Sequence, residues 1–379
     1  MTEEIKKPSP KPSRRRDTQE PKKRIIMIVA IALVIGVLAL GFAFYNYWNS
    51  GLEAMNPKDT KDYQIEIPVG SSTKQIGSIL EDKGIVKSGF VFSYYAKSHA
   101  KKGFQAGYYA LSPSMDVKKV VSTLEKGGST DPRGIPIATI TIPEGYTVDQ
   151  IGDLIEKKTD FSKEEFLNLM RNRDFYNKME QKYPELLQSE ESTIDQVRYY
   201  FEGYLYPATY NLYKKESLEE FVEEILGNMN TVMKEFYEPI KQQNLTVQHV
   251  LTLASLVEKE GVTEEDRRKI AGVFFNRIAK GMPLQSDISV TYAMGEHKVH
   301  LSVDDVRTQS PYNLYINPGF GPGPFNNPSK AAIDAVVYPE KSDYLYFIAD
   351  IKTGKVYFAK TFEEHEKLCS QYIEGYNNK

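Results

Sequence analysis

The sequence has few of the residues and motifs that form disulfides, metal sites and nucleotide-binding sites. Cys369 is the one cysteine among 379 residues, so no internal disulfide can form and packing alone must hold the folded parts together. The five histidines include His297 and His300, which have a spacing found in metal sites, but with one cysteine in the chain we expect no metal site. We find no phosphate-binding glycine loop and expect no cofactor. A net charge of −3 provides no positive field, so we expect no nucleic-acid partner.

Long apolar runs are also scarce, and the one present lies near the N-terminus. Residues 1–24 are rich in Lys, Arg, Pro and Ser, and we predict a disordered basic tail. Residues 25–45 follow as a predicted transmembrane helix, because the uncharged run is about as long as the roughly 20 residues that cross a bilayer core. Tyr45, Tyr47 and Trp48 then suit an interfacial aromatic belt.

The alternative for this run is a cleaved signal peptide. Such a peptide has an apolar region of only about 7 to 15 residues and a cleavage site of small residues, whereas this run is longer and ends in aromatics. The basic residues precede the run, so the positive-inside rule predicts a cytoplasmic N-terminus. We therefore predict a single-pass membrane protein whose remaining residues lie outside the cell membrane.

The outer part is predicted to be α+β. After a linker at 46–62, residues 63–130 form a small module: Tyr63, Ile65 and Ile67 alternate as in a strand, a turn follows, and apolar residues then repeat at helical spacing. About 75 residues later "IPEG" at 142–145 repeats "IPVG" at 67–70. Residues 131–243 are thus a second strand-turn-helix repeat followed by a mostly helical region, and residues 244–379 form a further α+β domain. The first module resembles LysM, a sugar-binding module of peptidoglycan-associated proteins, but a strand, turn and helix is also a common unit with no ligand.

A segment dense in tyrosine, "YYFEGYLYPATYNLY" at 199–213, lies between the predicted helices. Aromatic side chains at this density form either a plate within the core or a platform on which sugar rings stack. The sequence leaves both interpretations open.

Two glutamates mark the end of a predicted helix over 246–260, which begins at Thr246 and has a wide apolar face. With about 100° between successive residues, Glu260 lies about 70° and Glu258 about 90° from the centre of that face, on opposite flanks. A carboxyl group beside apolar side chains resists ionisation, and the raised pKa suits a general acid. The helical wheel favours Glu260 slightly, although a glutamate at a helix end is usually only a solvated charge.

Several downstream motifs occur together with "ASLVEKEG": "VFFNRIAKGMPLQSD", "VTYAMG", "SPYNLYINPGFGPGPFNNPSKAAIDAVVYP" and "YLYFIAD" before "VYFAKTFEEH". In order and spacing they resemble the YceG-like endolytic murein transglycosylases, and "FEGYLYPATY" matches as well. The chain departs from the family pattern at Leu314, where threonine is usual, and at Phe320-Gly321, where a Leu-Pro pair is usual.

The resemblance implies which residues form the site. It places the catalytic acid on Glu260, the second glutamate of the Glu-Lys-Glu. Glu258, Asp287 and Glu202 are possible supporting carboxylates. The candidate substrate-binding residues are Asn276, Arg277, Gln285, Ser286, Tyr312, Asn313, Tyr315 and Asn327.

The resemblance also implies a reaction, cleavage of the β-1,4 bond between N-acetylmuramic acid and N-acetylglucosamine in nascent peptidoglycan, leaving 1,6-anhydro ends and ending glycan elongation. The expected partners are glycan strands and, by resemblance, peptidoglycan synthases and elongation or division proteins. Two alternatives remain at this point: a muramidase of the same architecture that uses water, and a non-catalytic scaffold that only binds peptidoglycan.

Overall fold

The chain divides into two compact units, which a computed structural model describes over residues 20–131, 133–187, 191–296, 298, 301–350 and 353–372. The first unit extends to Ile135 and the second runs from Pro136 to the C-terminus. The described residues are mostly helical, with three small antiparallel two-stranded sheets, and this confirms the mixed α+β class. Most of the predicted basic tail, together with His297 and His300, lies outside the described residues.

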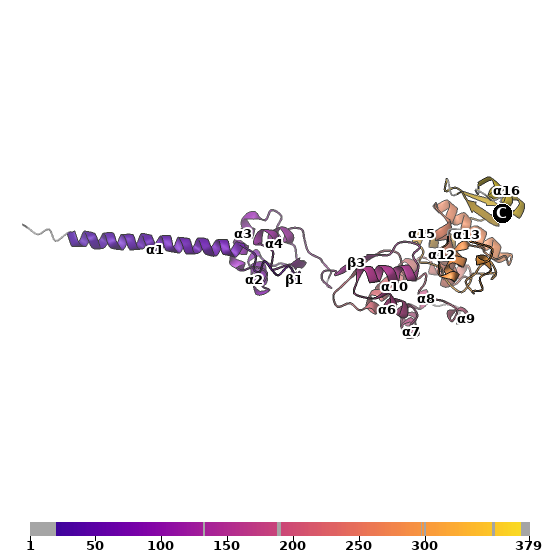
Figure 1. The fold of residues 1–379 in the computed structure, drawn as a ribbon, viewed down its shortest axis with the longest axis horizontal. Helices are drawn as coiled ribbons and strands as arrows, with labels where there is room; N and C mark the ends of the chain where they lie inside the picture. Colours follow the sequence, from indigo (N-terminus) through magenta and orange to yellow (C-terminus); the bar gives the residue numbers. More distant parts are fainter. Residues whose placement is uncertain are drawn as a thin grey trace, which may run out of the picture. The chain divides into compact units, whose positions relative to one another are not determined.

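The first unit begins with the long helix α1, Glu20–Leu52 (Figure 1). Its stretch Lys23–Leu52 is long and apolar enough to cross a membrane, a property that membrane anchors and signal sequences share. The helix continues past the predicted end at residue 45 and reaches Gly51, where an added Cβ would lie 2.7 Å from a methyl group of Val91. The end of α1 therefore packs directly on the module that follows.

That module has the order β1 (Tyr63–Ile67), α2 (Thr73–Asp82), α3 (Gly89–His99), β2 (Gly107–Leu111) and α4 (Val117–Leu124). The strands pair antiparallel with Tyr63 opposite Leu111. Ser72 begins α2 in a reciprocal capping box with Gln75, which satisfies backbone groups that a helix start leaves free. The core is formed by buried side chains from every element, among them Ile65, Ile76, Leu80, Phe92, Leu111 and Val120.

The second unit opens with the same order of elements, as the sequence repeat predicts. Strand β3 (Ala138–Thr141), α5 (Val148–Lys158) and α6 (Lys163–Met170) come first, and β4 (Thr209–Leu212) and α10 (Leu218–Met233) complete the repeat. Strands β3 and β4 pair antiparallel, as β1 and β2 do. Thr147 caps α5 in a box with Gln150, at the positions that correspond to Ser72 and Gln75.

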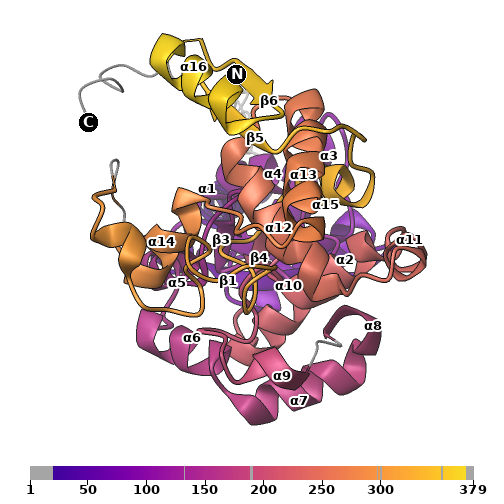
Figure 2. The same cartoon turned by 90° about the vertical axis from the view of Figure 1, so that its right-hand side faces the viewer.

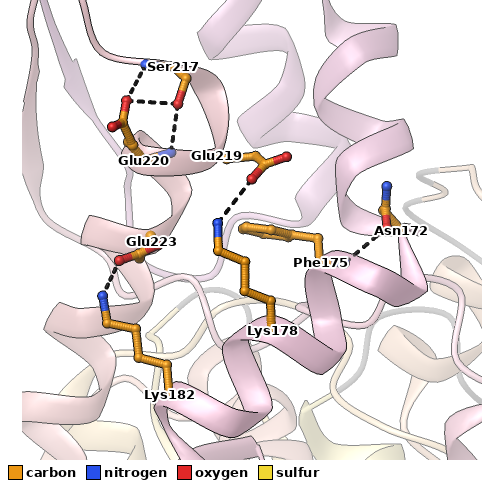
Figure 3. Close-up of polar contacts among 8 residues, drawn as sticks. All are labelled: Asn172, Phe175, Lys178, Lys182, Ser217, Glu219, Glu220 and Glu223. Atoms are coloured by element: carbon orange, nitrogen blue, oxygen red, sulfur yellow. Dashed lines mark hydrogen bonds and ion pairs between the residues drawn. The ribbon is translucent and has the colours of Figure 1, made fainter.

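Three helices are inserted between α6 and β4 of this repeat: α7 (Arg173–Lys182), α8 (Pro184–Leu187) and α9 (Glu191–Ile194). Helix α7 lies along α10, where Lys178 pairs with Glu219 at 3.2 Å and Lys182 pairs with Glu223 (Figure 3). These exposed pairs align the helices but each contributes only about 0.2–1 kcal/mol. Nearby, Ser217 caps α10 in a box with Glu220.

The C-terminal part packs around α12 (Val247–Glu260), with α13 (Glu264–Ala279) and α15 (Lys330–Val337) against it (Figure 2). The other elements are α11 (Tyr237–Gln242), α14 (Asp287–Met294), η1 (Asp305–Arg307), the hairpin β5 (Tyr346–Ala349) and β6 (Val356–Ala359), and α16 (Phe362–Tyr372). One hydrophobic core runs from Ile140 of β3 to Val356 of β6. It therefore includes side chains from both of the regions predicted as 131–243 and 244–379.

The tyrosine-dense segment contributes mainly to this core. Tyr199, Tyr204, Tyr210 and Tyr213 are all buried. Buried rings cannot offer a face to a sugar, so these four tyrosines form the core plate that the sequence left as one of two interpretations.

Candidate functional site

Helix α12 forms the base of the candidate site. It begins at Thr246, whose side chain accepts a hydrogen bond from the His249 N–H as predicted, and it ends before Gly261. Residues 251 to 257 are buried on all sides rather than on one face. The polar residues among them bond locally: Thr252 donates to the Gln248 carbonyl and Ser255 donates to the Thr252 carbonyl, each at 2.7 Å. Because α12 is enclosed, both glutamates at its end come close to apolar surroundings.

Glu260 is the last residue of α12 and remains partly exposed. Its pKa is raised to about 7, chiefly by burial and also by the charge of Asp287, while a hydrogen bond from Ser286 lowers it in part. That bond joins Ser286 Oγ to Glu260 Oε1 at 2.9 Å. The negative end of the helix dipole also lies here and disfavours a second negative charge. Glu260 is thus a carboxylic acid that can hold or release its proton near neutral pH.

Glu258 performs a different task from Glu260. Its carboxylate accepts hydrogen bonds from the backbone N–H and the hydroxyl of Ser329, the N-cap of α15, and it lies 3.8 Å from Arg267. These contacts fasten α12 to α15. The like charge that raises the pKa of Glu260 comes from Asp287, not from Glu258.

Asp287 and Tyr315 join the site from two other segments. Asp287 is the exposed first residue of α14, and its Oδ1 accepts a hydrogen bond of 2.5 Å from the Tyr315 hydroxyl. The charges of Asp287 and Glu260 and burial together raise the pKa of that hydroxyl, so it stays protonated and donates. The structure therefore brings four predicted residues together: Glu260, Ser286, Asp287 and Tyr315.

A cavity of about 620 Å³ adjoins these residues. Its wall includes Lys259 and Asp287, the chain neighbours of Glu260 and Ser286. The other lining residues come from the second repeat, the 191–208 segment, α14 and the 325–326 loop, and they include Thr147, Asp149, Gln150, Lys163, Arg198, Thr291, Tyr292, Lys298, Phe325 and Asn326. A cavity of this size accommodates a ligand of a few sugar rings.

Most of these lining residues escaped the sequence analysis. Arg198 sits 4.4 Å from the Tyr292 ring centroid and donates to the Ala293 carbonyl, yet no pattern in its sequence neighbourhood marks it. Tyr292 belongs to "VTYAMG", and Phe325 and Asn326 belong to the motif at 310–339, so the motifs included these three residues without assigning them to a cavity. Asn326 lines the cavity, and its buried Oδ1 has no hydrogen-bond partner among the described residues.

The turn between β3 and α5 forms part of the site wall. Gly145 has a φ of +71°, and an added Cβ would lie 2.8 Å from the Lys259 ammonium. Its N–H donates to the Asn327 carbonyl at 2.8 Å, and the Asn327 N–H donates to the Tyr146 carbonyl at 2.9 Å. The turn of the second repeat is therefore joined by backbone pairing to the loop beside α12.

Asn327 and Glu202 are buried next to this backbone pairing and do not line the cavity. The Asn327 amide donates to the Tyr146 carbonyl and to Glu202, and it accepts from the Leu205 N–H. Glu202 is 2% exposed and also accepts from the Val148 N–H and the Tyr292 hydroxyl. Burial raises its pKa to about 8 in spite of these donors. Through these hydrogen bonds the side chains of Asn327 and Glu202 connect the start of α5 in the second repeat to α14 and to the loop at residue 327.

The next predicted residues hold loops in place. The Asn276 amide donates to the carbonyls of Ser342 and Tyr344. Arg277 is buried and donates to the carbonyls of Leu345, Pro283 and Leu284 and to the Gln285 side chain. Gln285 adopts a left-handed φ of 56°, which turns the chain just before Ser286. Arg277 thus positions the segment that carries the Ser286 hydroxyl.

Tyr312 and Asn313 are likewise internal. The Tyr312 hydroxyl accepts from the Arg198 N–H, and its ring packs 4.8 Å from that of Tyr292. Asn313 is fully buried and its amide donates to the Val306 and Thr308 carbonyls. Leu314, one of the departures from the family pattern, is also fully buried. These three side chains are internal and stabilise the loop. Of the predicted residues in this loop, only Tyr315 contacts the site.

Comparisons with known proteins agree with one another. The YceG-like family model matches residues 65–371. A protein of Streptococcus pneumoniae serotype 2 named endolytic murein transglycosylase is 39% identical over 359 residues, which are 92% of this chain and 65% of that protein. A protein of the same name from Bacillus subtilis is 36% identical over 90% of this chain and 93% of its own length.

A solved structure is similar as well. The crystal structure of a yceG-like protein from Listeria monocytogenes is 38% identical in sequence, with a TM-score of 0.58, over 81% of this chain and 99% of that one. Together, the family match and these relatives show that the chain belongs to the YceG-like family. It spans about two thirds of the pneumococcal protein's length, at 65%.

Proposed function

We propose that the protein is a membrane-anchored endolytic lytic transglycosylase that cuts nascent peptidoglycan strands. The relatives' name supports the reaction class. The observation that carries the proposal is Glu260, whose pKa of about 7 suits acid-base chemistry and whose neighbours Lys259 and Asp287 line the cavity.

The first step uses Glu260 as a general acid. Protonated Glu260 gives its proton to the oxygen that links N-acetylmuramic acid to N-acetylglucosamine, and the C1–O bond breaks as that oxygen leaves as a hydroxyl. Positive charge develops at C1 of the muramic acid. The sugar's own N-acetyl group stabilises this charge, so one carboxylate suffices where ordinary glycosidases need two.

The second step uses the same group as a general base. The Glu260 carboxylate removes the proton of the C6 hydroxyl, whose oxygen bonds to C1 and closes the 1,6-anhydro ring. The proton lost in the first step is thereby recovered, and Glu260 is ready for the next cut. A pKa near 7 suits both directions of transfer, because neither protonation state is strongly favoured at neutral pH.

Ser286, Asp287 and Tyr315 support this cycle in our proposal. Ser286 orients the Glu260 carboxyl through its hydrogen bond, and Asp287 keeps the Glu260 pKa high through its charge. Tyr315 holds Asp287 in place. Arg198 and Lys259, which line the cavity, suit the carboxylates of peptide stems.

The apolar stretch of α1 serves in this proposal as a single-pass anchor, with the N-terminus in the cytoplasm and the cutting site outside. A tether limits how far the site reaches from the membrane, which suits cutting of new strands where they are made. Peptidoglycan synthases and elongation or division proteins would then be neighbours.

The decisive experiment compares the purified chain with its Glu260→Gln variant on isolated peptidoglycan, followed by mass spectrometry of the released fragments. We expect anhydro-ended fragments from the wild type and a loss of at least about a hundredfold in the variant, as for removal of a general acid. Glu258→Gln is the matched control, because it changes a carboxylate two residues away that only fastens α15. Loss of activity in the control alone would reassign the acid.

The same digest tests the two alternatives. A muramidase releases reducing ends instead of anhydro ends, and the second carboxylate it needs would then be Asp287, which lines the cavity, rather than the buried Glu202. A binding scaffold releases nothing, with or without the Glu260→Gln change.

A further inference from the structure

One face of α3 is exposed although it is largely aromatic. Phe90 is 59% exposed and Tyr94 is 61% exposed, and they lie one turn apart on the same side of the helix. Lys97 continues this face and is exposed as well. The opposite side, with Phe92 and Ala96, is buried in the module core. This surface, Phe90, Tyr94 and Lys97, is here called the α3 face.

Helix α3 lies beside the end of α1 (Figure 1). Three contacts join the two helices. The Tyr47 and Ser88 hydroxyls are 2.7 Å apart, the Trp48 and Tyr94 rings meet edge to face with centroids 5.4 Å apart, and Gly51 lies against Val91. With aromatic, polar and close-packed contacts together, α3 is fixed to α1 rather than tethered by a flexible linker.

These contacts set the depth of α3 relative to a membrane. The apolar run ends at Phe44, and each residue of an α-helix advances about 1.5 Å. Tyr47 and Trp48 therefore lie about 4.5 and 6 Å beyond the run along α1. The interfacial layer on each side of the hydrocarbon core is roughly 5–8 Å thick. Tyr47 and Trp48, which contact α3, thus fall within that layer whenever the apolar run spans the core, whereas Gly51 lies beyond it, about 10.5 Å from the end of the run.

We propose that the α3 face lies in the headgroup layer of the outer leaflet and makes the first module a membrane-apposed domain. Its partner is the lipid bilayer itself. The inference rests on the proposed membrane span of α1. It goes beyond that proposal, because a span alone does not determine how the following module is oriented relative to the membrane.

The chemistry of the α3 face fits this partner. Aromatic side chains favour the boundary between headgroups and acyl chains, where tyrosine keeps its hydroxyl in the wet layer. Lys97 on the same face, and the exposed Lys101 and Lys102 just after α3, are placed to meet the phosphates of anionic lipids. The rings thus face acyl chains while the ammonium groups face headgroups.

The single tryptophan of the chain, Trp48, makes a direct test possible. The full chain is placed in nanodiscs of phosphatidylcholine and phosphatidylglycerol, and tryptophan emission is quenched either by brominated lipids or by aqueous acrylamide. In the wild type, Trp48 reports the insertion of α1. A Trp48→Phe, Phe90→Trp variant moves the reporter to the α3 face, and a Trp48→Phe, Val69→Trp variant moves it to the β1–α2 turn, where Val69 is 93% exposed.

We expect the Phe90→Trp reporter to be quenched by brominated lipids and protected from acrylamide, and the Val69→Trp reporter to behave in the opposite way. A Phe90→Trp reporter open to acrylamide and unaffected by brominated lipids overturns the proposal, as does one protected from both, which indicates a protein partner. If Trp48 itself escapes brominated lipids, the span of α1 fails instead. Equal thermal unfolding of the variants and the wild type verifies that both reporters sit in folded protein.

Discussion

Ser286 donates a hydrogen bond of 2.9 Å to Glu260, while the residue that follows it in the chain, Asp287, places a negative charge beside the same carboxyl group. The two neighbours act in opposite directions. The hydrogen bond lowers the pKa of Glu260 and the charge raises it. Their opposition makes the pH dependence of activity a sensitive test of the site.

Removal of each neighbour should move the alkaline side of the pH profile in opposite directions. In the proposed mechanism cleavage begins with protonated Glu260, so the rate should fall as the pH rises through about 7. Ser286→Ala removes the bond that lowers the Glu260 pKa and should move this fall to higher pH. Asp287→Asn removes the charge and should move it to lower pH. Initial rates of fragment release between pH 5 and 9 measure both, and shifts in the same direction would contradict the assignment.

Arg277 should matter for stability more than for binding. Arg277→Met removes the donor to three backbone carbonyls, and the bond to the Leu284 carbonyl is buried while those to Leu345 and Pro283 are partly buried. A buried unsatisfied group costs about 1–3 kcal/mol, so we expect a loss of at least about 1 kcal/mol. Lys280→Met, at the exposed C-cap of the same helix, is the control and should change little. Urea unfolding measures both. A stable Arg277→Met variant with a raised KM would instead support direct substrate binding.

Gly145 tests whether the turn of the second repeat contributes to the site. Gly145→Ala adds backbone strain of about 1–2 kcal/mol at positive φ and drives a methyl group against Lys259 beside Glu260. Gly70→Ala imposes similar strain at the equivalent turn of the first module, where an added Cβ meets nothing within 4 Å. We expect both variants to lose similar stability and only Gly145→Ala to lose several-fold in cleavage rate. Equal cleavage rates in Gly145→Ala and Gly70→Ala would show that the turn at Gly145 does not contribute to catalysis.

Glu202 should make stability depend on pH. Its pKa is about 8 in the folded chain against an ordinary value of 4.5, so the folded state retains its proton longer than the unfolded state. The stabilisation is fully present below pH 4.5 and is lost as the pH rises through about 8. Glu202→Gln removes this proton and should flatten the change in free energy of unfolding between pH 5 and 8.

The control for this prediction is Glu219→Gln, which alters an exposed carboxylate on α10. Denaturant unfolding across the pH range should give parallel curves for the control and the wild type. A Glu202→Gln curve that also runs parallel to the wild type would show that Glu202 does not retain its proton on folding.

The sequence predicted what local pattern determines. Thr246 marked the start of α12, the apolar spacing marked its body, and the repeat of "IPVG" as "IPEG" marked matching strand-turn-helix units. Helix geometry favoured Glu260 over Glu258 only slightly, and the resemblance of the downstream motifs turned that preference into a predicted acid.

What the sequence left unresolved depends on contacts between distant segments. The partner of Glu258 is Ser329, 71 residues away, and nothing local distinguishes that bond from solvation. Arg277 and Asn313 carry side chains that suit ligands, but folding places backbone carbonyls within their reach instead. The cavity wall is likewise drawn from separated segments, so Arg198 had no local signal.

The backbone pairing of Tyr146 with Asn327 also governs how the protein can be dissected. A fragment that starts near residue 244 would retain Glu260 but lose the turn that contacts Lys259 and all the core side chains that residues 140–240 contribute. Such a fragment should aggregate, whereas one that starts at Pro136 keeps the whole core. The shortest fragment that folds on its own should therefore begin more than a hundred residues before Glu260.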